Sequence, residues 1–208
     1  MKTKADVIVK SSSTEERIKE AARKVFTQKG YAATRTRDIA EEAGLNLALL
    51  NYYFRSKEKL YDMIMIEAVQ GFASRVIKIV NNEYTTFYEK TELMTENYME
   101  FLIDHPGLPL FIINAMNDDP KKFFSKIGFK RPDSNVMIRQ LVQILMEEEK
   151  KIHPINIMVN MMGMIVFPFL SAPIALKMGN VSKDEFIMVL EQRKKLIPVW
   201  IEAIIKSS

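Results

Sequence analysis

Apolar side chains recur every three to four positions in the first part of the chain, which is the spacing of amphipathic α-helices. A Ser13-x-x-Glu16 capping box precedes the first run and predicts a helix that begins near Thr14. Gly30 follows the last apolar position and predicts the end of that helix. Residues 1–10 contain no apolar run of signal-peptide length and are expected to form a loose basic arm. The apolar positions of the run are Ile18, Ala21, Ala22, Val25 and Phe26.

Three more helices are expected before residue 82, because residues that favour helix caps precede each apolar run. The second is short and ends at Gly44, whose flexibility suits a tight turn. The third is also short, and the fourth is long. Their expected spans are 35–43 after Thr34, 47–54 after Asn46, and 57–81 after Ser56.

The rest of the chain shows helical spacing between proline- and glycine-rich breaks and no sustained strand alternation. A second capping box, Ser182-x-x-Glu185, opens the last segment, 182–206. We therefore expect an all-α protein of about nine helices.

The segment Ile152–Leu176 holds 25 residues without a charged side chain, which is long enough to span a membrane. It also contains Asn156 and Asn160, and asparagine is costly in lipid unless it is paired. We favour a helix buried between its own core and a second subunit, with a membrane anchor as the alternative.

Charge is distributed unevenly along the 208 residues, although the formal net charge is only +4. Residues 1–60 hold 13 Lys and Arg against 8 Asp and Glu, a net charge of +5, whereas residues 61–208 hold 17 against 18. The first part is therefore suited to bind a polyanion. The chain has no cysteine, which excludes disulfides, thiolate metal sites and cysteine nucleophiles and fits a reducing compartment.

No Ser/His/Asp arrangement, phosphate-binding loop or dinucleotide fingerprint is present, so we expect neither an enzyme nor a cofactor. His105 and His153 lack a partner at ligand spacing, so we also expect no metal.

The second and third helices, joined by a turn at Gly44, form a helix-turn-helix with its motif at about 35–54. A short projecting helix fits the major groove of DNA, which is about 12 Å wide and displays a distinct pattern for each base pair. Basic residues flank the motif: Arg35, Arg37, Arg55, Lys57 and Lys59.

The same region resembles the TetR/AcrR family of bacterial regulators, through Arg37-Asp38-Ile39-Ala40, Ala43-Gly44, Tyr53-Phe54 and Ser56-Lys57-Glu58. The resemblance covers about residues 14–65. It implies a DNA-binding domain over 1–58 and a helical effector-binding and dimerisation domain over 59–208. It further implies a homodimer, which we place at about 154–176 and 183–206.

The resemblance implies DNA-contacting roles for residues between 34 and 57 of this chain. Thr34 and Lys57 match phosphate contacts, and Tyr52 and Tyr53 match positions that touch the DNA backbone. Leu47 and Leu49 are apolar where the family often has polar or small residues, and Asn51 replaces a frequent tyrosine. Leucine can contact thymine methyls and asparagine can pair with adenine, which hints at A·T preference. Arg37 matches a family arginine whose role varies between structural pairing and DNA contact. The candidates for reading bases are Arg35, Thr36, Asn46, Leu47, Ala48 and Asn51.

Methionine is unusually frequent, with 14 residues, and it suits adaptable apolar surfaces. An effector pocket in the second domain is one interpretation, and ordinary helical core is the other. The candidates to line such a pocket are Phe72, Tyr88, Tyr98, Phe101, Phe111, Met158, Met162 and Phe167.

We therefore expect a cytoplasmic, nucleoid-associated bacterial regulator, a repressor that binds a palindromic operator in double-stranded DNA as a homodimer. A small apolar or amphipathic effector would release it, and no membrane partner is expected. The alternative is a DNA-bound structural or partner-recruiting protein with the same first domain and no working effector pocket.

Overall fold

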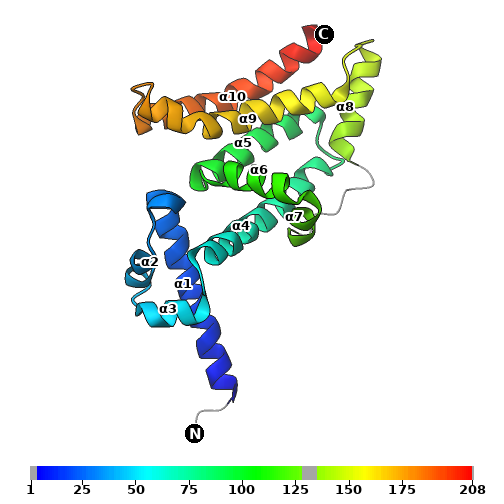
Figure 1. Cartoon of the computed structure of the whole chain (residues 1–208). Helices are drawn as coiled ribbons and strands as arrows, with labels where there is room; N and C mark the ends of the chain where they lie inside the picture. Colours follow the sequence, from blue (N-terminus) through cyan, green and yellow to red (C-terminus); the bar gives the residue numbers. More distant parts are fainter. Residues whose placement is uncertain (1–3, 128–134, 208) are drawn as a thin grey trace. The chain divides into compact units, whose positions relative to one another are not determined.

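The structure, a computed structural model, describes residues 4–127 and 135–207, and for residues 4–12 it describes the backbone alone. Within these ranges it contains ten helices and no strand, so the all-α prediction is confirmed (Figure 1). The helices are α1 (Lys4–Ala33), α2 (Thr36–Glu42), α3 (Leu47–Tyr53), α4 (Lys57–Val80), α5 (Phe87–Asp104), α6 (Leu108–Asp118), α7 (Pro120–Lys126), α8 (Val136–Glu147), α9 (Pro154–Lys177) and α10 (Lys183–Ser207).

The first helix begins earlier than expected, at Lys4 instead of near Thr14. Residues 4–12 contain no proline or glycine, so nothing ends the helix on the N-terminal side of the capping box. The predicted loose arm is therefore wrong from residue 4 onward, and residues 1–3 lie outside the described part. Gly30 interrupts the helix as expected, with a φ of 75° that L-residues rarely adopt.

Two compact units divide the chain, Met1–Val69 and Gln70–Ser208. The first unit extends past the expected boundary at 58, because Leu60 and Ile64 of α4 belong to the core of this unit. Its other buried residues come from α1, α2 and α3, and Ile18, Ile39 and Leu50 are almost fully buried.

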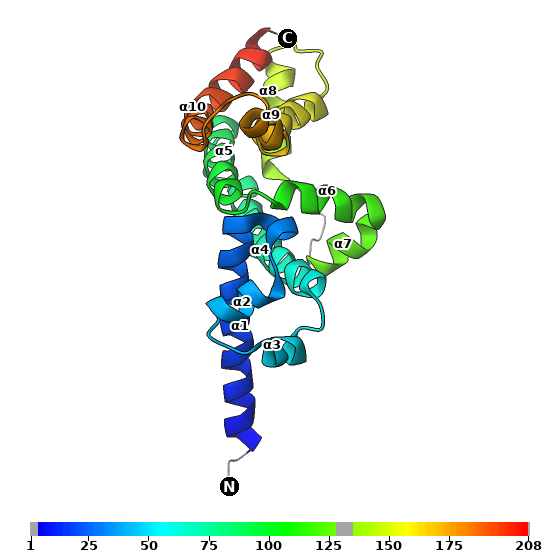
Figure 2. The ribbon, with the colours of Figure 1, turned by 60° about the vertical axis from the view of Figure 1, so that its left-hand side comes forward.

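The second unit is a helical bundle in which α10 packs against both α5 and α9 (Figures 1 and 2). A buried lysine, Lys90 of α5, joins α5 to α8: its ammonium donates to the carbonyl and hydroxyl of Thr85 and, at 3.0 Å, to Oε1 of Gln140. These oxygens replace the water that the ammonium loses on burial.

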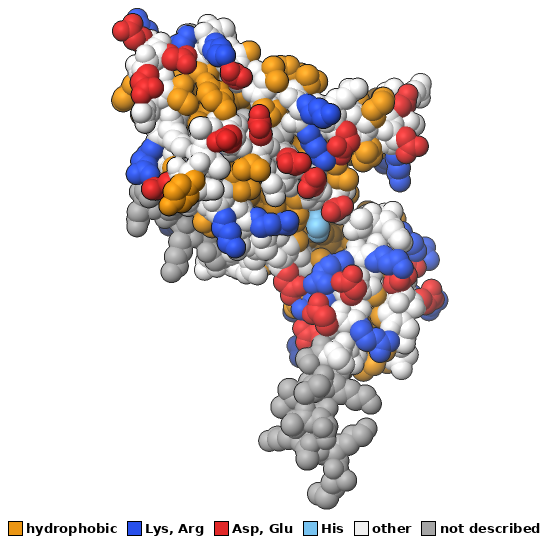
Figure 3. Space-filling model, turned by 180° about the vertical axis from the view of Figure 1, so that it is seen from behind, with side chains coloured by type: hydrophobic (Ala, Val, Ile, Leu, Met, Phe, Trp, Pro, Cys, Tyr) orange, Lys and Arg blue, Asp and Glu red, His pale blue; other side chains and the backbone are white. Residues whose placement is uncertain are grey.

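Helix α9 is only partly covered by its own unit. It is the one helix in the described ranges that is long and apolar enough to cross a membrane, and 22% of its most apolar stretch is buried. Ile157, Met161, Ile165 and Phe169 are buried at a spacing of four residues. The opposite face carries Ile155, Val159 and Phe167, which are 56%, 60% and 66% exposed. Figure 3 shows apolar side chains at the surface of this unit.

Candidate nucleic-acid interface

Helices α2 and α3 form the expected helix-turn-helix. The turn between them closes through backbone hydrogen bonds from Gly44 to Glu41 at 3.0 Å and from Leu45 to Ala40 at 2.9 Å. Gly44 has a φ of 62°, in the left-handed region where glycine is favoured. Nη2 of Arg17 donates to the carbonyl of Ala43 at 2.8 Å, which ties α1 to the turn. Sequence reasoning missed Arg17, because nothing in a 26-residue separation signals this bond.

The start of α3 is capped by Asn46, whose Oδ1 accepts a hydrogen bond from the backbone N–H of Leu49 at 2.8 Å. Leu50 and Phe54 are buried, 1% and 4% exposed, and hold α3 on the core, so the core interpretation of both is confirmed. Leu47 and Tyr53 pack partly against the same core. The side chains of α3 that reach solvent are Asn46, Ala48, Asn51 and Tyr52.

Most basic residues of α1 are neutralised. Lys19 and Arg23 each pair with Glu67 of α4 at 2.9 Å and also with carboxylates of α1. Lys24 pairs with Glu42 at 2.6 Å, and Lys29 pairs with Asp38 at 3.3 Å. On the face of this unit drawn in Figure 3, basic and acidic side chains lie next to one another.

The basic residues around α2 and α3 are different. Four of them are exposed, and none pairs with a carboxylate of the described residues. Arg35 precedes α2, Arg37 lies in its first turn, and Arg55 and Lys59 flank the start of α4. These four side chains therefore place positive charge that is available to a polyanion beside the helix-turn-helix.

Two expected phosphate contacts form hydrogen bonds within the unit. Thr34 is 2% exposed, and its hydroxyl donates to the carbonyl of Gly30 at 2.7 Å. Thr34 also does not cap α2: Arg35 is the N-cap residue, and its backbone N–H donates to the Asp38 carboxylate at 2.9 Å. That bond and the ammonium of Lys29 hold the pKa of Asp38 below its ordinary value. The ammonium of Lys57 donates to the carbonyls of Tyr31 and Thr34 at 2.8 and 3.0 Å.

The comparisons with known proteins agree with this geometry. A family model described as bacterial regulatory proteins, tetR family, matches residues 18–64, the helix-turn-helix and the helices on either side of it. The resemblance to the TetR family is thereby shown for the helix-turn-helix and the helices beside it.

Two curated relatives match with 28% identity. One is the HTH-type transcriptional regulator YttP of Bacillus subtilis, over 51% of this chain and 52% of that protein. The other is the HTH-type transcriptional regulator SAR2658 of Staphylococcus aureus, over 50% and 55%. The chain thus matches about half the length of these relatives.

Solved structures of TetR-family regulators share the fold over most of the chain. A TetR/AcrR regulator from Thermobifida fusca aligns with a TM-score of 0.58 at 17% identity, covering 88% of this chain and 96% of that one. FadR from Bacillus subtilis, in complex with stearoyl-CoA, aligns with a TM-score of 0.56 at 17% identity over the same shares. At this identity the likeness concerns the fold.

The eight effector candidates come from four helices, α4, α5, α6 and α9. Phe72, Tyr98 and Phe101 pack on each other: the rings of Phe72 and Phe101 stack at 4.1 Å, and Tyr98 meets Phe72 edge-on at 4.4 Å. Burial raises the pKa of Tyr98 to about 12. Phe111 of α6 lies near Phe123 of α7, with ring centroids 6.4 Å apart.

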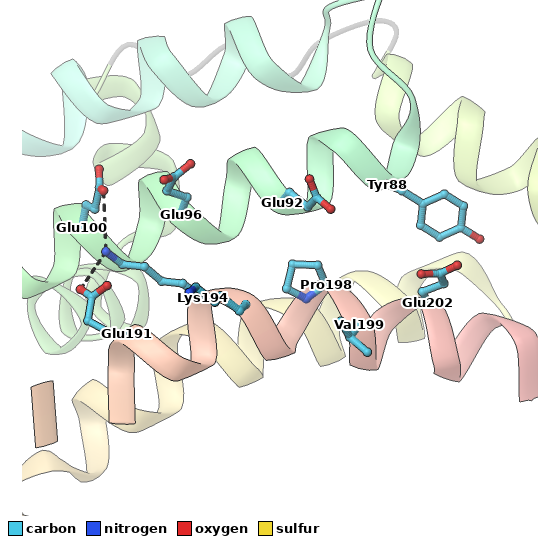
Figure 4. A pocket seen from close by; sticks show the side chains of 10 residues that line it. Tyr88, Glu92, Glu96, Glu100, Glu191, Lys194, Pro198, Val199 and Glu202 are labelled. Carbon is cyan, nitrogen blue, oxygen red and sulfur yellow. Dashed lines mark ion pairs between the residues drawn. The ribbon is translucent and has the colours of Figure 1, made fainter. Parts of the chain in front are cut away.

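The remaining candidates are divided between α9 and a groove. Met158 and Met162 are half-buried on α9, and Phe167 is exposed on it. Tyr88 lines a groove of about 540 Å³ between α5 and α10 (Figure 4). Glu92, Glu96 and Glu100 of α5 line it, and Lys194 reaches across from α10 to Glu100.

The groove is mostly acidic. Lys194 of α10 pairs with Glu191 at 2.8 Å and with Glu100 at 3.7 Å, while Glu92 and Glu96 pair with none of the described basic residues. Pro198 and Val199 add apolar surface to its α10 wall. Sequence reasoning identified only Tyr88 of this set, because the groove forms between helices about 90 residues apart.

Proposed function

We propose that the chain regulates transcription by binding double-stranded DNA through α2 and α3. The observation that carries this proposal is the set of exposed basic residues beside α3 that pair with no carboxylate of the described residues, whereas Lys19, Arg23, Lys24 and Lys29 of α1 are paired. We keep nine of the expected contacts and leave out Thr34 and Lys57, whose polar groups are bonded within the unit. The contacts are Arg35, Thr36, Arg37, Asn46, Leu47, Ala48, Asn51, Tyr52 and Tyr53.

Base recognition falls to the exposed face of α3. Asn51 projects to solvent and carries an amide that can bind adenine through two hydrogen bonds. Ala48 is exposed beside it and offers an apolar contact to thymine methyls. This pair supports the A·T preference within the operator.

A homodimer through α9 and α10 fits the uncovered apolar face of α9. A second copy would cover Ile155, Val159 and Phe167, since an isologous interface places the same patch on both subunits. Two-fold symmetry then matches a palindromic operator, with half-sites about 34–36 Å apart. The uncovered face is thereby explained without a membrane, in keeping with a cytoplasmic, nucleoid-associated protein.

We further propose that the protein is a repressor released by a small apolar or amphipathic effector that binds the second unit. One neighbour in fold, FadR from Bacillus subtilis, was solved with stearoyl-CoA, so a long-chain acyl-CoA is a reasonable first compound to test. A ligand that binds one arrangement of the dimer better than the other would change the spacing of the two α3 helices.

One observation favours the alternative, a DNA-bound structural protein without an effector site. The rings of Phe72, Tyr98 and Phe101 pack against one another, as they would in an ordinary helical core. The two functions separate in one assay: an effector must both raise the melting temperature and weaken DNA binding. If the compounds tested change neither the melting temperature nor the DNA affinity, the structural role is favoured.

A salt titration of duplex binding tests the DNA-binding proposal. We expect the logarithm of the association constant to fall linearly with the logarithm of salt concentration, because phosphate contacts release counterions. The Arg37→Ala variant should reduce that slope by about 0.9, as expected for one lost phosphate contact. Failure of the parent protein to bind any duplex at low salt would refute the proposal.

A further inference from the structure

Lys57, at the start of α4, is held by the segment that joins α1 to α2. Its ammonium donates to the carbonyls of Tyr31 and Thr34 at 2.8 and 3.0 Å, and it lies 4.2 Å from the centre of the Tyr31 ring. No carboxylate of the described residues pairs with it. An ammonium has three N–H donors, so two of them serve backbone acceptors here.

The acceptors are available because α1 ends at Ala33: the last carbonyls of a helix have no partner within it, and Thr34 follows the helix. Gly30, with a φ of 75° and a ψ of 164°, interrupts the helix just before them. The Thr34 hydroxyl closes the same segment by donating to the Gly30 carbonyl at 2.7 Å. Lys57 of α4 therefore donates hydrogen bonds to carbonyls that have no partner within α1.

Aromatic packing strengthens the same junction. The ring of Tyr31 lies 4.7 Å from that of Tyr61, one turn after Lys57 on α4. Both rings also contact Phe26 of α1, with centroids 6.1 and 5.0 Å away. Tyr31 is thus held between a cation and a ring of α4, and this places the first turn of α4 against the entry to α2.

We propose that Lys57 is a positioning residue that sets α2 and α3 relative to α4, and that its loss weakens DNA binding through this positioning. This inference rests on the proposed function in one respect, because the effect of positioning is measured as DNA affinity. A bond that fixes the entry to α2 also fixes the two-helix unit that follows it. Loss of the bond should therefore misplace α3 even in protein that stays folded.

The experiment compares Lys57→Met with Lys59→Met, a substitution of the same kind at an exposed, unpaired lysine on the same helix. Affinity for one duplex is measured across a range of salt concentrations, at a temperature where each variant is fully folded. For Lys57→Met we expect a melting temperature below that of the parent and about tenfold weaker binding at every salt concentration, with the slope unchanged. For Lys59→Met we expect an unchanged melting temperature and, if this lysine touches a phosphate, a slope smaller by about 0.9.

Three results overturn the proposal. Lys57→Met could lower the slope by about 0.9 at an unchanged melting temperature, which identifies a phosphate contact. It could lower the melting temperature without weakening the binding of the folded protein, which identifies a purely structural lysine. It could also change neither quantity.

A second variant keeps the test decisive if Lys57→Met does not fold. Tyr31→Leu removes the ring beneath the ammonium but keeps the carbonyl and changes no charge, so it should weaken binding with an unchanged slope. An unaltered affinity in Tyr31→Leu would count against the proposal.

If the parent protein binds no duplex, amide hydrogen exchange in α2 and α3 tests the positioning role of Lys57 without DNA. Exchange in these helices that is faster in Lys57→Met than in Lys59→Met supports positioning. Equal rates in the two variants overturn it, whatever the function of the protein.

Discussion

Asn46 both caps α3 and lies exposed beside the proposed DNA-binding face. Its Oδ1 accepts the N–H of Leu49 and so starts α3, while the residue itself is exposed beside the proposed DNA-binding face. The sequence predicts the cap, because asparagine before an apolar run is a strong start signal. The family resemblance also makes Asn46 a candidate base contact. Substitution separates the two roles.

Asn46→Ala removes the cap and should lower the free energy of unfolding by about 1 kcal/mol, a typical value for a lost N-cap. Asn46→Asp keeps an acceptor for Leu49 and should retain stability, yet it adds a negative charge where DNA phosphates would lie, so binding should weaken. Urea unfolding and duplex titration measure the two effects. Equal DNA affinity in the parent and Asn46→Asp would place Asn46 away from the interface.

Thr34 and Lys57 mark where residue-level prediction stops. Their positions beside the motif could be recognised from the sequence, but their hydrogen-bond partners could not. The partners are backbone carbonyls at the end of α1, and a carbonyl carries no sequence signal. Exposed residues such as Asn51 and Tyr52 were easier to identify, because helical spacing alone separates them from the buried Leu50.

At the scale of elements, helix starts were predictable where a cap follows a break. The Ser182–Glu185 capping box is present as expected, with the Ser182 N–H donating to Glu185 at 2.8 Å and the Glu185 N–H to the Ser182 hydroxyl at 3.2 Å. The Ser13–Glu16 pair misled, because no break precedes it and α1 continues to Lys4. A capping box predicts a start only where the preceding residues cannot be helical.

The Ser182–Glu185 pair also gives a pH dependence. The backbone and hydroxyl of Ser182 hold the pKa of Glu185 below its ordinary value of 4.5. Since the folded pKa is the lower one, the bond stabilises the fold above about pH 4.5, and this stabilisation is lost as the pH falls through the folded pKa. Glu185→Gln should melt below the parent at neutral pH, and the difference should shrink on acidification. A difference independent of pH would contradict this.

Helix α9 continues through Pro168, which has no backbone N–H to offer the carbonyl of Met164 four residues earlier. Arg193 of α10 replaces the missing donor: its Nη2 donates to that carbonyl at 2.8 Å. Burial lowers the pKa of Arg193. The sequence showed the proline, but it did not show that Arg193 supplies the missing hydrogen bond, because Arg193 is 29 residues away on another helix.

A double-mutant cycle tests this compensation. Arg193→Met leaves the Met164 carbonyl without a partner and should cost about 1–3 kcal/mol in the free energy of unfolding. Pro168→Ala restores the N–H, so Arg193→Met should cost about 1 kcal/mol less in that background. Contacts of Arg193 that do not involve Met164, such as its position 5.3 Å from the Trp200 ring, cancel in the cycle. Additive effects in urea unfolding would show that the proline and the arginine act independently.

At the scale of the whole molecule, composition predicted the polyanion-binding part of the chain well and the place of a ligand site poorly. The excess of positive charge in residues 1–60 indicated the polyanion-binding part, and in the structure the unpaired cations lie beside α2 and α3. The aromatic and methionine content did not indicate where a ligand binds. Residues of one type can fill a core, face a partner or line a groove, and only packing decides among them.

The uncovered face of α9 gives the last prediction. In a dimer joined through this face, Val159→Glu places an unpaired carboxylate in the interface of both subunits, so we expect dimerisation at least about a hundredfold weaker. Leu110→Glu on α6 is the matched control, since Leu110 is 58% exposed and Val159 60%. Neither substitution buries a charge within one subunit, so both monomers should stay folded. Sedimentation equilibrium measures the association, and two equally stable dimers would mean that α9 does not form the interface.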